Sequence, residues 1–428
     1  MSRRGTSAFA PLRYAPFRFL LAGRTINSLG NAIAPVALAF AVLDLTGSPS
    51  ALGLVVGARM LVNVVFLLFG GALADRMPKH HLMVGSSIAA AVTQGAVAAL
   101  VLSGTATIPL LVALSAVNGM VSALALPASS SILPQLLPAA VRQQGIALSR
   151  LSFTGAYIVG APLGGVIVAS VGPGWGIAVD AVAFLLSAAA FALLRIPATA
   201  VPATAAAGPG RTGILTDLRV GWGEFRSRTW LWVVVTGFAL INAALSGGMS
   251  ILGPVVADAT IGRRAWGFVL AAQTTGMLVG ALLAMRLTMS RLLLFGVVCT
   301  AFEVLPMLTL GVLPHLGLLL ATAFLAGLGI EQFAVAWETS MQEHVPADKL
   351  ARVYSYDMVG SFVAIPIGQV AAGPIAQAVG VEKTLVGAAA LIGLAVVGML
   401  ASRDVRNLRH RLPTSTEPAG AAMEESTR

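Results

Sequence analysis

The chain has 428 residues, of which 57% are hydrophobic and only 10% are charged, and its formal net charge is +10. This composition lies far outside the range of soluble domains and excludes an ordinary soluble enzyme or binding domain. A helix needs about 20 apolar residues to cross a membrane, and apolar stretches of that length recur along the whole chain.

Twelve apolar stretches, separated by short segments rich in glycine, proline and charge, predict twelve transmembrane helices. The first stretch has no small-residue cleavage site behind it, so we expect a retained helix and not a signal peptide. The single Cys299 permits no intramolecular disulfide. The predicted spans are 17–43, 51–73, 81–102, 108–133, 146–171, 175–195, 229–252, 265–285, 292–312, 316–340, 353–378 and 384–401.

The Lys and Arg residues are distributed unevenly between the two sides of the membrane. Nearly all of them fall on the side of the N-terminus, whereas the opposite side holds Arg263, Arg264 and Lys383. Because cytoplasmic loops retain positive charge, both termini are predicted to be cytoplasmic. The basic residues are spread over many short segments, which argues against a nucleic-acid partner. Few lysines and abundant Ala and Gly suggest a bacterial inner-membrane protein.

The middle of the chain divides it into two sets of six helices. Residues 197–210 are rich in Pro, Ala, Thr and Gly, which is typical of a linker. Residues 217–226 have helical spacing with one apolar side and predict a short amphipathic surface helix. We therefore predict an N-terminal six-helix bundle (1–195), a cytoplasmic linker (196–228), a C-terminal six-helix bundle (229–402) and a disordered cytoplasmic tail (403–428).

Similar segments recur at a steady offset in the two sets. Residues 70–76 and 280–286 lie 210 positions apart, and Gly119 and Gly327 lie 208 positions apart. Such an offset favours duplication of a six-helix unit. Two six-helix halves of like topology are the plan of many secondary transporters.

The sequence GALADR at residues 71–76 resembles the loop 2–3 signature of the major facilitator superfamily, G-x-L-A-D-R-x-G-R-[KR], although Pro78 and His80 depart from it. The first helix, residues 17–31, further resembles the drug, siderophore and macrolide exporter branch. The resemblance covers nearly the whole chain. It implies an all-α membrane protein with two pseudo-symmetric halves, working by alternating access, with helices 1, 4, 7 and 10 around a central cavity.

The loop motif predicts a gate. Small residues such as Gly71 let helices approach closely in a membrane. Asp75 is expected to pair with Arg76 or to cap a neighbouring helix, a contact that would favour one state of the carrier. Asp357, near the cytoplasmic end of the eleventh helix, is expected to meet this gate. The alternative is that Asp75 and Arg76 are solvated loop charges.

The fifth helix carries a second motif, Gly160, Pro162, Gly164 and Gly165, that resembles the G-P-x-x-G-G antiporter signature of exporters. Pro162 removes a backbone hydrogen bond, and the glycines let another helix close against the bend. The motif therefore predicts a hinge. Ordinary Gly and Pro usage in transmembrane helices is the alternative.

Ionisable residues inside the membrane are costly unless they are paired, hydrated or functional. Glu331 lies near the middle of the tenth helix and Glu338 lies two turns further on, so both are candidates for proton coupling. Arg24, Asn27 and Asn31 form a polar stripe on the first helix. Arg24 is expected to hold an anionic substrate group or to favour the ionised form of a facing carboxylate such as Glu338. The alternative, for Glu331 and for the pair of Arg24 with Glu338, is a fixed interhelical ion pair that only sets helix packing.

Three further charged residues are expected to have lesser roles. Asp180 and Glu303 fall on helices that are peripheral in the resembled fold, so packing or capping at the membrane interface is expected for both. Arg59 is expected to extend its side chain toward the membrane surface.

The side chains expected on the cavity helices are mostly apolar and aromatic with a few polar groups. Such a wall suits an amphipathic organic molecule. The polar and aromatic substrate candidates are Arg24, Asn27, Asn31, Asn242, Gln273 and Trp337, and the further wall residues are Phe40, Met120, Trp232, Met249 and Phe333.

These observations predict a proton-coupled exporter of an amphipathic drug-like or secondary-metabolite compound. We expect a small-molecule substrate, surrounding lipid, no nucleic acid, no cofactor or metal beyond the proton gradient, and function as a monomer. The alternatives are an importer or facilitator of a small metabolite, a membrane enzyme acting on lipid, and a non-transporting sensor or scaffold. No nucleotide-binding P-loop is present, which argues against ATP drive. No metal-ligand cluster and no Ser/His/Asp or Cys/His grouping supports an enzyme.

Overall fold

The computed structural model describes residues 9–74, 79–194, 222–223, 225–287 and 289–410. Within these ranges the chain is helical and contains no strand. After a short 3₁₀ turn, η1 (Ala10–Arg13), six long helices come first: α1 (Ala15–Thr46), α2 (Pro49–Ala74), α3 (Lys79–Leu102), α4 (Ile108–Leu136), α5 (Ala139–Val171) and α6 (Pro173–Ala192).

In the second set of six membrane helices, three of the predicted helices are divided into shorter segments. We call each such row of segments a rod and number it by its place among the twelve membrane helices. The seventh rod consists of α8 (Thr229–Leu245), a π segment η3 (Ser246–Leu252) and α9 (Gly253–Ala259). The ninth consists of α11 (Leu292–Cys299), a 3₁₀ segment η4 (Thr300–Glu303) and α12 (Val304–Val312), and the eleventh of α14 (Ala347–Phe362) and α15 (Ala364–Val379). The others are α10 (Arg263–Ala284), α13 (Leu316–His344), α16 (Val381–Ala401) and the short α17 (Arg403–Asn407).

The helix ends follow local sequence signals. Proline lies in the first turn of α1, α4 and α6, where its missing N–H costs no hydrogen bond. Gly47 ends α1 in the left-handed conformation (φ 62°), and its N–H donates to the carbonyl of Leu43.

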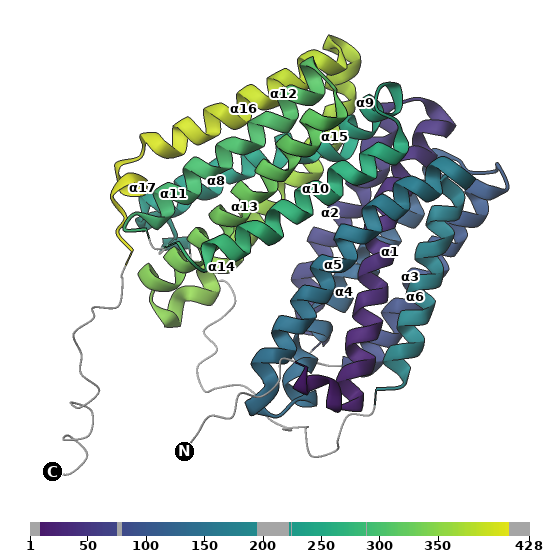
Figure 1. Cartoon of the computed structure of the whole chain (residues 1–428), viewed down its shortest axis with the longest axis horizontal. Helices are drawn as coiled ribbons and strands as arrows, with labels where there is room; N and C mark the ends of the chain where they lie inside the picture. The colour runs from purple at the N-terminus through teal and green to yellow at the C-terminus, as the bar shows by residue number, and fades with distance from the viewer. Residues whose placement is uncertain (1–8, 75–78, 195–221, 224, 288, 411–428) are drawn as a thin grey trace.

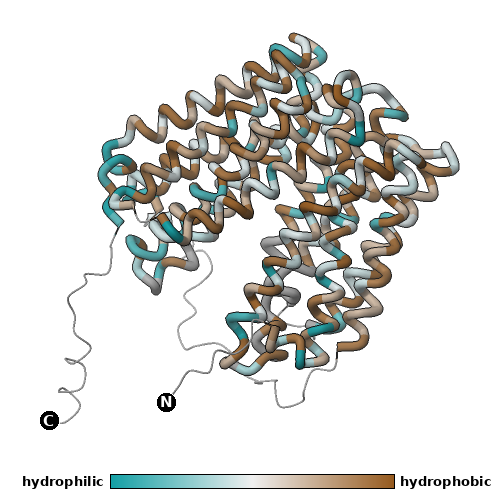
Figure 2. Tube along the Cα trace, in the orientation of Figure 1, coloured by the Kyte–Doolittle hydropathy of each residue, from teal (hydrophilic) through white to brown (hydrophobic). Residues whose placement is uncertain are grey.

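The apolar character of the helices confirms an integral membrane protein. In the described part of the chain, eleven helices are long and apolar enough to cross a membrane, and α4 adds the shorter apolar stretch Ile108–Leu124. Figure 2 shows hydrophobic residues along most of the helical length. Large apolar side chains such as Leu394 and Val397 face outward, as lipid-facing residues do. The predicted all-α fold with twelve membrane helices in two halves is confirmed.

The helices form two bundles, an N-terminal half (α1–α6) and a C-terminal half (α8–α16), seen in Figure 1. We call the end at which α1 begins and α16 ends the proximal end, and the end at which α1 ends and α10 begins the distal end. The halves contact each other mainly through α5 against α10 and α2 against α15. Figure 1 shows them touching near α9 and diverging toward the proximal end.

One close helix crossing occurs in both halves. A Cβ on Gly119 of α4 would collide with the backbone carbonyl oxygen of Arg59 on α2. A Cβ on Gly327 of α13 would collide in the same way with that of Gln273 on α10. The two glycines singled out by their spacing of 208 residues therefore make equivalent crossings, because only glycine leaves room for such close backbones.

Several predicted boundaries differ from the observed ones. The fifth helix begins at Ala139 and the eleventh at Ala347, six or seven residues before the predicted starts, because polar residues at the membrane surface continue these helices. The linker and the amphipathic helix at 217–226 lie mostly outside the described residues. Disorder from residue 403 onward is wrong for the start of the tail: α17 is helical, and the N–H of His410 donates to the carbonyl of Ser290.

Candidate functional site

A central cavity of about 460 Å³ lies where the two halves meet, and both halves contribute to its wall. The wall mixes apolar groups with uncharged polar groups, one guanidinium and one phenol. It is lined from the N-terminal half by Asn31, Pro35, Val36, Val56, Arg59, Met60, Asn63, Ser122 and Tyr157, and from the C-terminal half by Met249, Ser250, Pro254, Trp266, Leu270, Gln273 and Gln369.

The polar stripe of α1 is only partly on the cavity. Asn31 lines it, and its amide donates to the side-chain oxygen of Asn27 at 2.5 Å and to the Asn27 carbonyl at 3.0 Å. Arg24, half-buried further toward the proximal end, is absent from the described lining. Asn27 therefore orients Asn31, and the assignment of Arg24 to the substrate stays a prediction.

Arg59 lies on the cavity, and the expectation that it extends to the membrane surface is wrong. Its Nη2 donates to Asn31 Oδ1 at 3.5 Å. One turn further on, Asn63 Nδ2 donates to the carbonyl of Gly119 at 3.0 Å. The spacing of four residues between Arg59 and Asn63 places both on one face of the helix, a signal available in the sequence.

Asp180 lies behind the cavity wall, between α6, α1 and α3. It is 0% exposed, and Gln94 Nε2 donates to its Oδ2 at 2.6 Å. Its other oxygen, Oδ1, has no hydrogen-bond partner among the described residues. Arg59 and Tyr157, both on the cavity wall, lie within electrostatic reach of this carboxylate. Asp180 therefore interacts electrostatically with two residues of the cavity wall. The packing role expected from the sequence did not include such an interaction.

The C-terminal half contains a second, smaller pocket of about 170 Å³. Asn242 and Trp337, both predicted on the substrate wall, line it together with Asp357. Trp337 Nε1 donates to Asp357 Oδ2 at 3.1 Å, and the rings of Phe238 and Phe333 stack with centroids 4.6 Å apart. The pocket combines an aromatic wall with one carboxylate.

The two predicted coupling residues differ in their surroundings. Glu331 is half-buried against Gly280 of α10 and lies within electrostatic reach of Arg150 on α5 of the opposite half. Glu338 is exposed, and its Oε1 accepts hydrogen bonds from Tyr354 and Gln342, both at 2.6 Å. Partial burial, together with the bond to Glu338, raises the pKa of Tyr354 to about 12.

The alternative of a fixed pair between Arg24 and Glu338 is wrong for this state. The carboxylate of Glu338 is bonded by residues of its own half, and Arg24 has no hydrogen bond or ion pair among the described residues.

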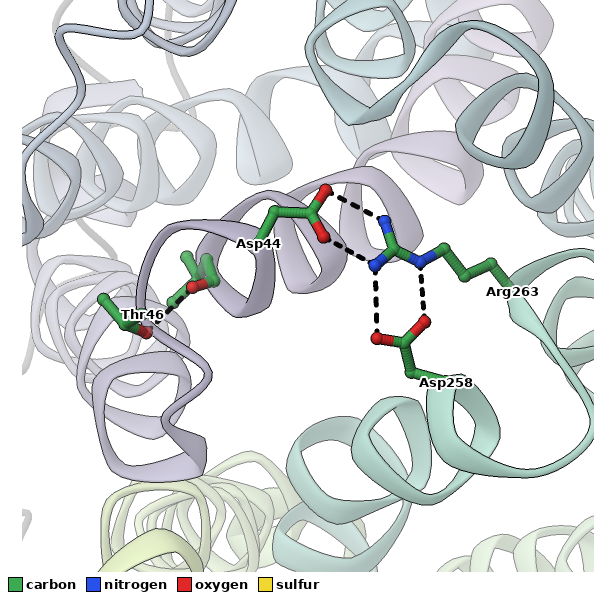
Figure 3. Close-up of polar contacts among 5 residues, drawn as sticks. Asp44, Thr46, Asp258 and Arg263 are labelled. Carbon is green, nitrogen blue, oxygen red and sulfur yellow. Dashed lines mark hydrogen bonds and ion pairs between the residues drawn. The ribbon is translucent and has the colours of Figure 1, made fainter.

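An ion cluster at the distal end joins the halves (Figure 3). Arg263, at the start of α10, forms two parallel hydrogen bonds to Asp44 of α1, at 2.9 and 2.5 Å. It forms two more to Asp258 of α9, at 2.7 and 3.1 Å. The guanidinium carbon lies 4.9 Å from the ring centroid of Phe40. In the sequence, Arg263 stands out only as one of the few basic residues on the side opposite the N-terminus. That observation does not indicate its partners, so this cluster was not predicted.

The glycines of the α5 motif face two different partners. A Cβ on Gly164 would lie 3.2 Å from the backbone of Ile33 on α1, and one on Gly165 would lie 2.9 Å from the carbonyl oxygens of Arg263 and Arg264. Gly160 likewise packs against α1. The helix continues through Pro162. The motif thus packs at the interface of the halves, and its role as a hinge stays a prediction.

The gate motif is described only in part. Gly71 lies in α2, and Asp75 and Arg76 lie outside the described residues. Asp357 is bonded within its own half, by Trp337 and by Ser361 Oγ at 3.3 Å. Its contact with the gate stays a prediction.

Some of the predicted wall residues lie elsewhere. Trp232 is 43% exposed on the outside of α8, and Phe40 is fully buried beside Arg263. Met249 and Gln273 line the central cavity as expected. Among the described residues, no group of three or more His, Cys, Asp or Glu side chains is arranged to hold a metal ion.

Comparison with known proteins identifies a single family over most of the chain. The sequence model of the Major Facilitator Superfamily matches residues 20–369. The "Multidrug efflux pump Tap" of Mycolicibacterium fortuitum is 28% identical over 389 residues, which cover 86% of this chain and 91% of that protein. The "Chloramphenicol resistance protein" of Streptomyces lividans is 30% identical over 212 residues, about half of each chain (49% and 48%).

Solved structures show the same fold. The nucleoside transporter NupG superposes with a TM-score of 0.70 at 14% sequence identity, covering 90% of this chain and 98% of that chain.

Proposed function

Because this chain belongs to the Major Facilitator Superfamily, we propose that it exports an amphipathic drug-like or secondary-metabolite compound in exchange for protons. It is a multi-pass membrane transporter and not an enzyme, and its substrate is a small molecule. The export direction, the proton coupling, the substrate class, a bacterial inner membrane and cytoplasmic termini are parts of the proposal.

The observation that carries the proposal is the central cavity shared by the two halves. Both halves line it, and the distal end is held together by Arg263 with Asp44 and Asp258. A site between two halves that are joined at one end suits alternating access, in which the halves rock about the bound substrate. The bond between α1 and α10 has to break for the distal end to open.

The direction is supported by the loading side and by the relatives. The halves diverge toward the proximal end, which is the end predicted to be cytoplasmic, and are joined at the distal end by Arg263 and Asp44, which supports loading from the cytoplasm. Two relatives are named for drug efflux or drug resistance. The α5 motif, whose glycines pack against α1 and α10, resembles the signature that exporters carry, although Ala161 replaces its first glycine.

The substrate class is supported by the two pockets. The central cavity offers apolar area with a few neutral polar groups, such as Asn31 and Gln273. The smaller pocket adds the stacked rings of Phe238 and Phe333 and the carboxylate of Asp357. Such mixed surfaces bind amphipathic compounds through contact area, with few directional bonds.

Glu331 is the proposed coupling residue of the C-terminal half. It is half-buried on α13 and lies within electrostatic reach of Arg150 in the other half. Rocking of the halves would separate these two charges and so change the affinity of Glu331 for a proton.

The test uses inside-out vesicles from a pump-depleted bacterial host, energised to form an acid interior and followed with acridine orange. A panel of amphipathic antibiotics starting with chloramphenicol is added to vesicles with the native chain, with Glu331→Gln, or without the protein. We expect compound-dependent proton release with the native chain and its loss in Glu331→Gln. If proton release persists in Glu331→Gln, the proposed export stands and the assignment of Glu331 as the coupling residue is wrong. If the compound moves in the opposite direction, the result supports an importer.

A further inference from the structure

We propose that Asp180 is a proton-binding site of the N-terminal half, reached from the central cavity past Arg59 and Tyr157. The inference rests on the proposed proton-coupled transport and adds a site separate from Glu331 in the C-terminal half.

The burial of Asp180 is the first observation. The side chain is 0% exposed, deep within the N-terminal half. Gly30 of α1 lies directly against it, since a Cβ there would come within 2.5 Å of Asp180 Oδ1. The sequence thus leaves space for a carboxyl group between two helices at a position where an apolar residue would pack without any polar cost.

The hydrogen bonding of Asp180 is incomplete. Oδ2 accepts one hydrogen bond, from Gln94 of α3, while Oδ1 has no partner among the described residues. An ionised carboxylate has room for several donors, so burying it with a single donor is unfavourable. A proton on Oδ1 removes the charge and leaves Oδ2 free to accept from Gln94.

The groups that face Asp180 come from each neighbouring helix. On α1 it meets Gly30, and on α3 the neutral amide of Gln94. The charged or titratable groups within electrostatic reach are Arg59 on α2 and Tyr157 on α5. Arg59 is therefore the one cation among the described residues positioned to stabilise the ionised form.

Arg59 connects the buried carboxyl group to the cavity. Its side chain lines the cavity and donates a long, 3.5 Å hydrogen bond to Asn31. A guanidinium that turns toward Asp180 favours release of its proton, and one that is drawn into the cavity favours proton uptake. A substrate that occupies the cavity and displaces Arg59 toward Asp180 would therefore compete with protonation of Asp180. The proton arrives at Oδ1 from the distal phase and leaves to the proximal phase after the halves rock.

Glu303 provides a matched control within the same chain. It is 1% exposed, and its Oε2 also has no hydrogen-bond partner in the described part of the chain. It is absent from the described lining of the central cavity and of the smaller pocket. Asp180 is also absent from that lining, but the cavity-lining Arg59 and Tyr157 lie within electrostatic reach of it, whereas no such group among the described residues acts on Glu303. We therefore expect Glu303 to take no part in proton movement.

The test is an infrared titration of the purified full chain in lipid, between about pH 5 and about pH 9, which needs no substrate. The native chain is expected to show a carboxyl C=O band that disappears as the pH rises. Asp180→Asn is expected to remove that component, and Glu303→Gln to retain it. Arg59→Gln removes the stabilising cation, so the titration midpoint should move upward by about one pH unit.

An unchanged titration in Asp180→Asn would overturn the inference, as would a midpoint that does not move in Arg59→Gln. If Asp180→Asn does not fold, the Arg59→Gln shift decides alone. The titration needs no transport, so the two proposals can be tested separately. A chain that shows the titrating band but exports nothing would contradict the proposed function. A chain that exports without this band would contradict only the inference about Asp180.

Discussion

The two halves share their packing and differ in their chemistry. In each half a glycine allows one helix to cross another at nearly backbone contact, Gly119 against Arg59 and Gly327 against Gln273. Both partner side chains reach the central cavity. The N-terminal half therefore presents a charged group at the position of the crossing where the C-terminal half presents a neutral amide.

The two halves also differ in the surroundings of their buried carboxyl groups, Asp180 and Glu303. Asp180 lies behind Arg59 and accepts a bond from Gln94. Glu303, 209 residues after Gln94, lies where the ninth rod narrows to the 3₁₀ segment η4. The two glycines make the same kind of close crossing, whereas the polar groups around the two buried carboxyl groups differ.

The largest expected effect tests the shared packing. Gly119→Ala and Gly327→Ala each add a methyl group against a backbone carbonyl, so each should destabilise its half by roughly 1–3 kcal/mol. Thermal unfolding in detergent measures this loss. Gly95→Ala and Gly393→Ala, where a Cβ meets nothing within 4 Å, are the controls in α3 and α16 and should be neutral or stabilising. Equal stability of all four variants would remove the argument for equivalent crossings.

The next prediction concerns the polar difference at the crossing. Arg59→Gln should reduce drug-driven proton release roughly tenfold, because it removes the charged group between the cavity and Asp180. Gln273→Ala should change it no more than about threefold, since a neutral amide at an open cavity is readily replaced by water. Acridine-orange traces with the most active compound of the panel provide the comparison. Equal losses of proton release in both variants would mean that the charge of Arg59 has no special part in proton release.

The ion cluster that joins the halves gives a smaller effect. Arg263→Gln should weaken the distal closure by about 1 kcal/mol after solvent screening, a roughly fivefold change in population, since its partners are partly exposed. Labelling of Ser250→Cys on the cavity wall, in a Cys299→Ser background, by an impermeant maleimide from the distal side measures it. Arg264→Gln, one residue away, should leave the labelling rate unchanged. Faster labelling in both would indicate a general charge effect.

The smallest expected effect lies in the aromatic pocket of the C-terminal half. Trp337→Phe keeps a ring and removes the Nε1–H that donates to Asp357. The apparent affinity for a transported compound should fall by roughly two- to threefold, as for one partly exposed hydrogen bond. Concentration dependence of the vesicle response measures it, with the surface residue Trp232→Phe as control. An equal change in Trp232→Phe would remove the pocket from the substrate path.

The sequence predicted the fold well because membrane helices depend on local composition and length. It also indicated Gly119 and Gly327, since a fixed offset is visible without a structure. It did not assign Arg59, Asp180 or Arg263, because their roles depend on neighbours 28 to 219 residues away. The stripe on α1 was predicted from spacing, but which of its members reach the cavity depends on the rotation of the helix.

The most direct test of this division between the halves is compound-driven proton release in inside-out vesicles with Asp180→Asn and Glu303→Gln side by side, at matched protein levels. The two carboxyl groups are almost equally buried, and one lies behind the cavity wall. We predict that release is lost in Asp180→Asn and retained in Glu303→Gln. Retention of release in Asp180→Asn, or equal loss in both variants, would contradict the account.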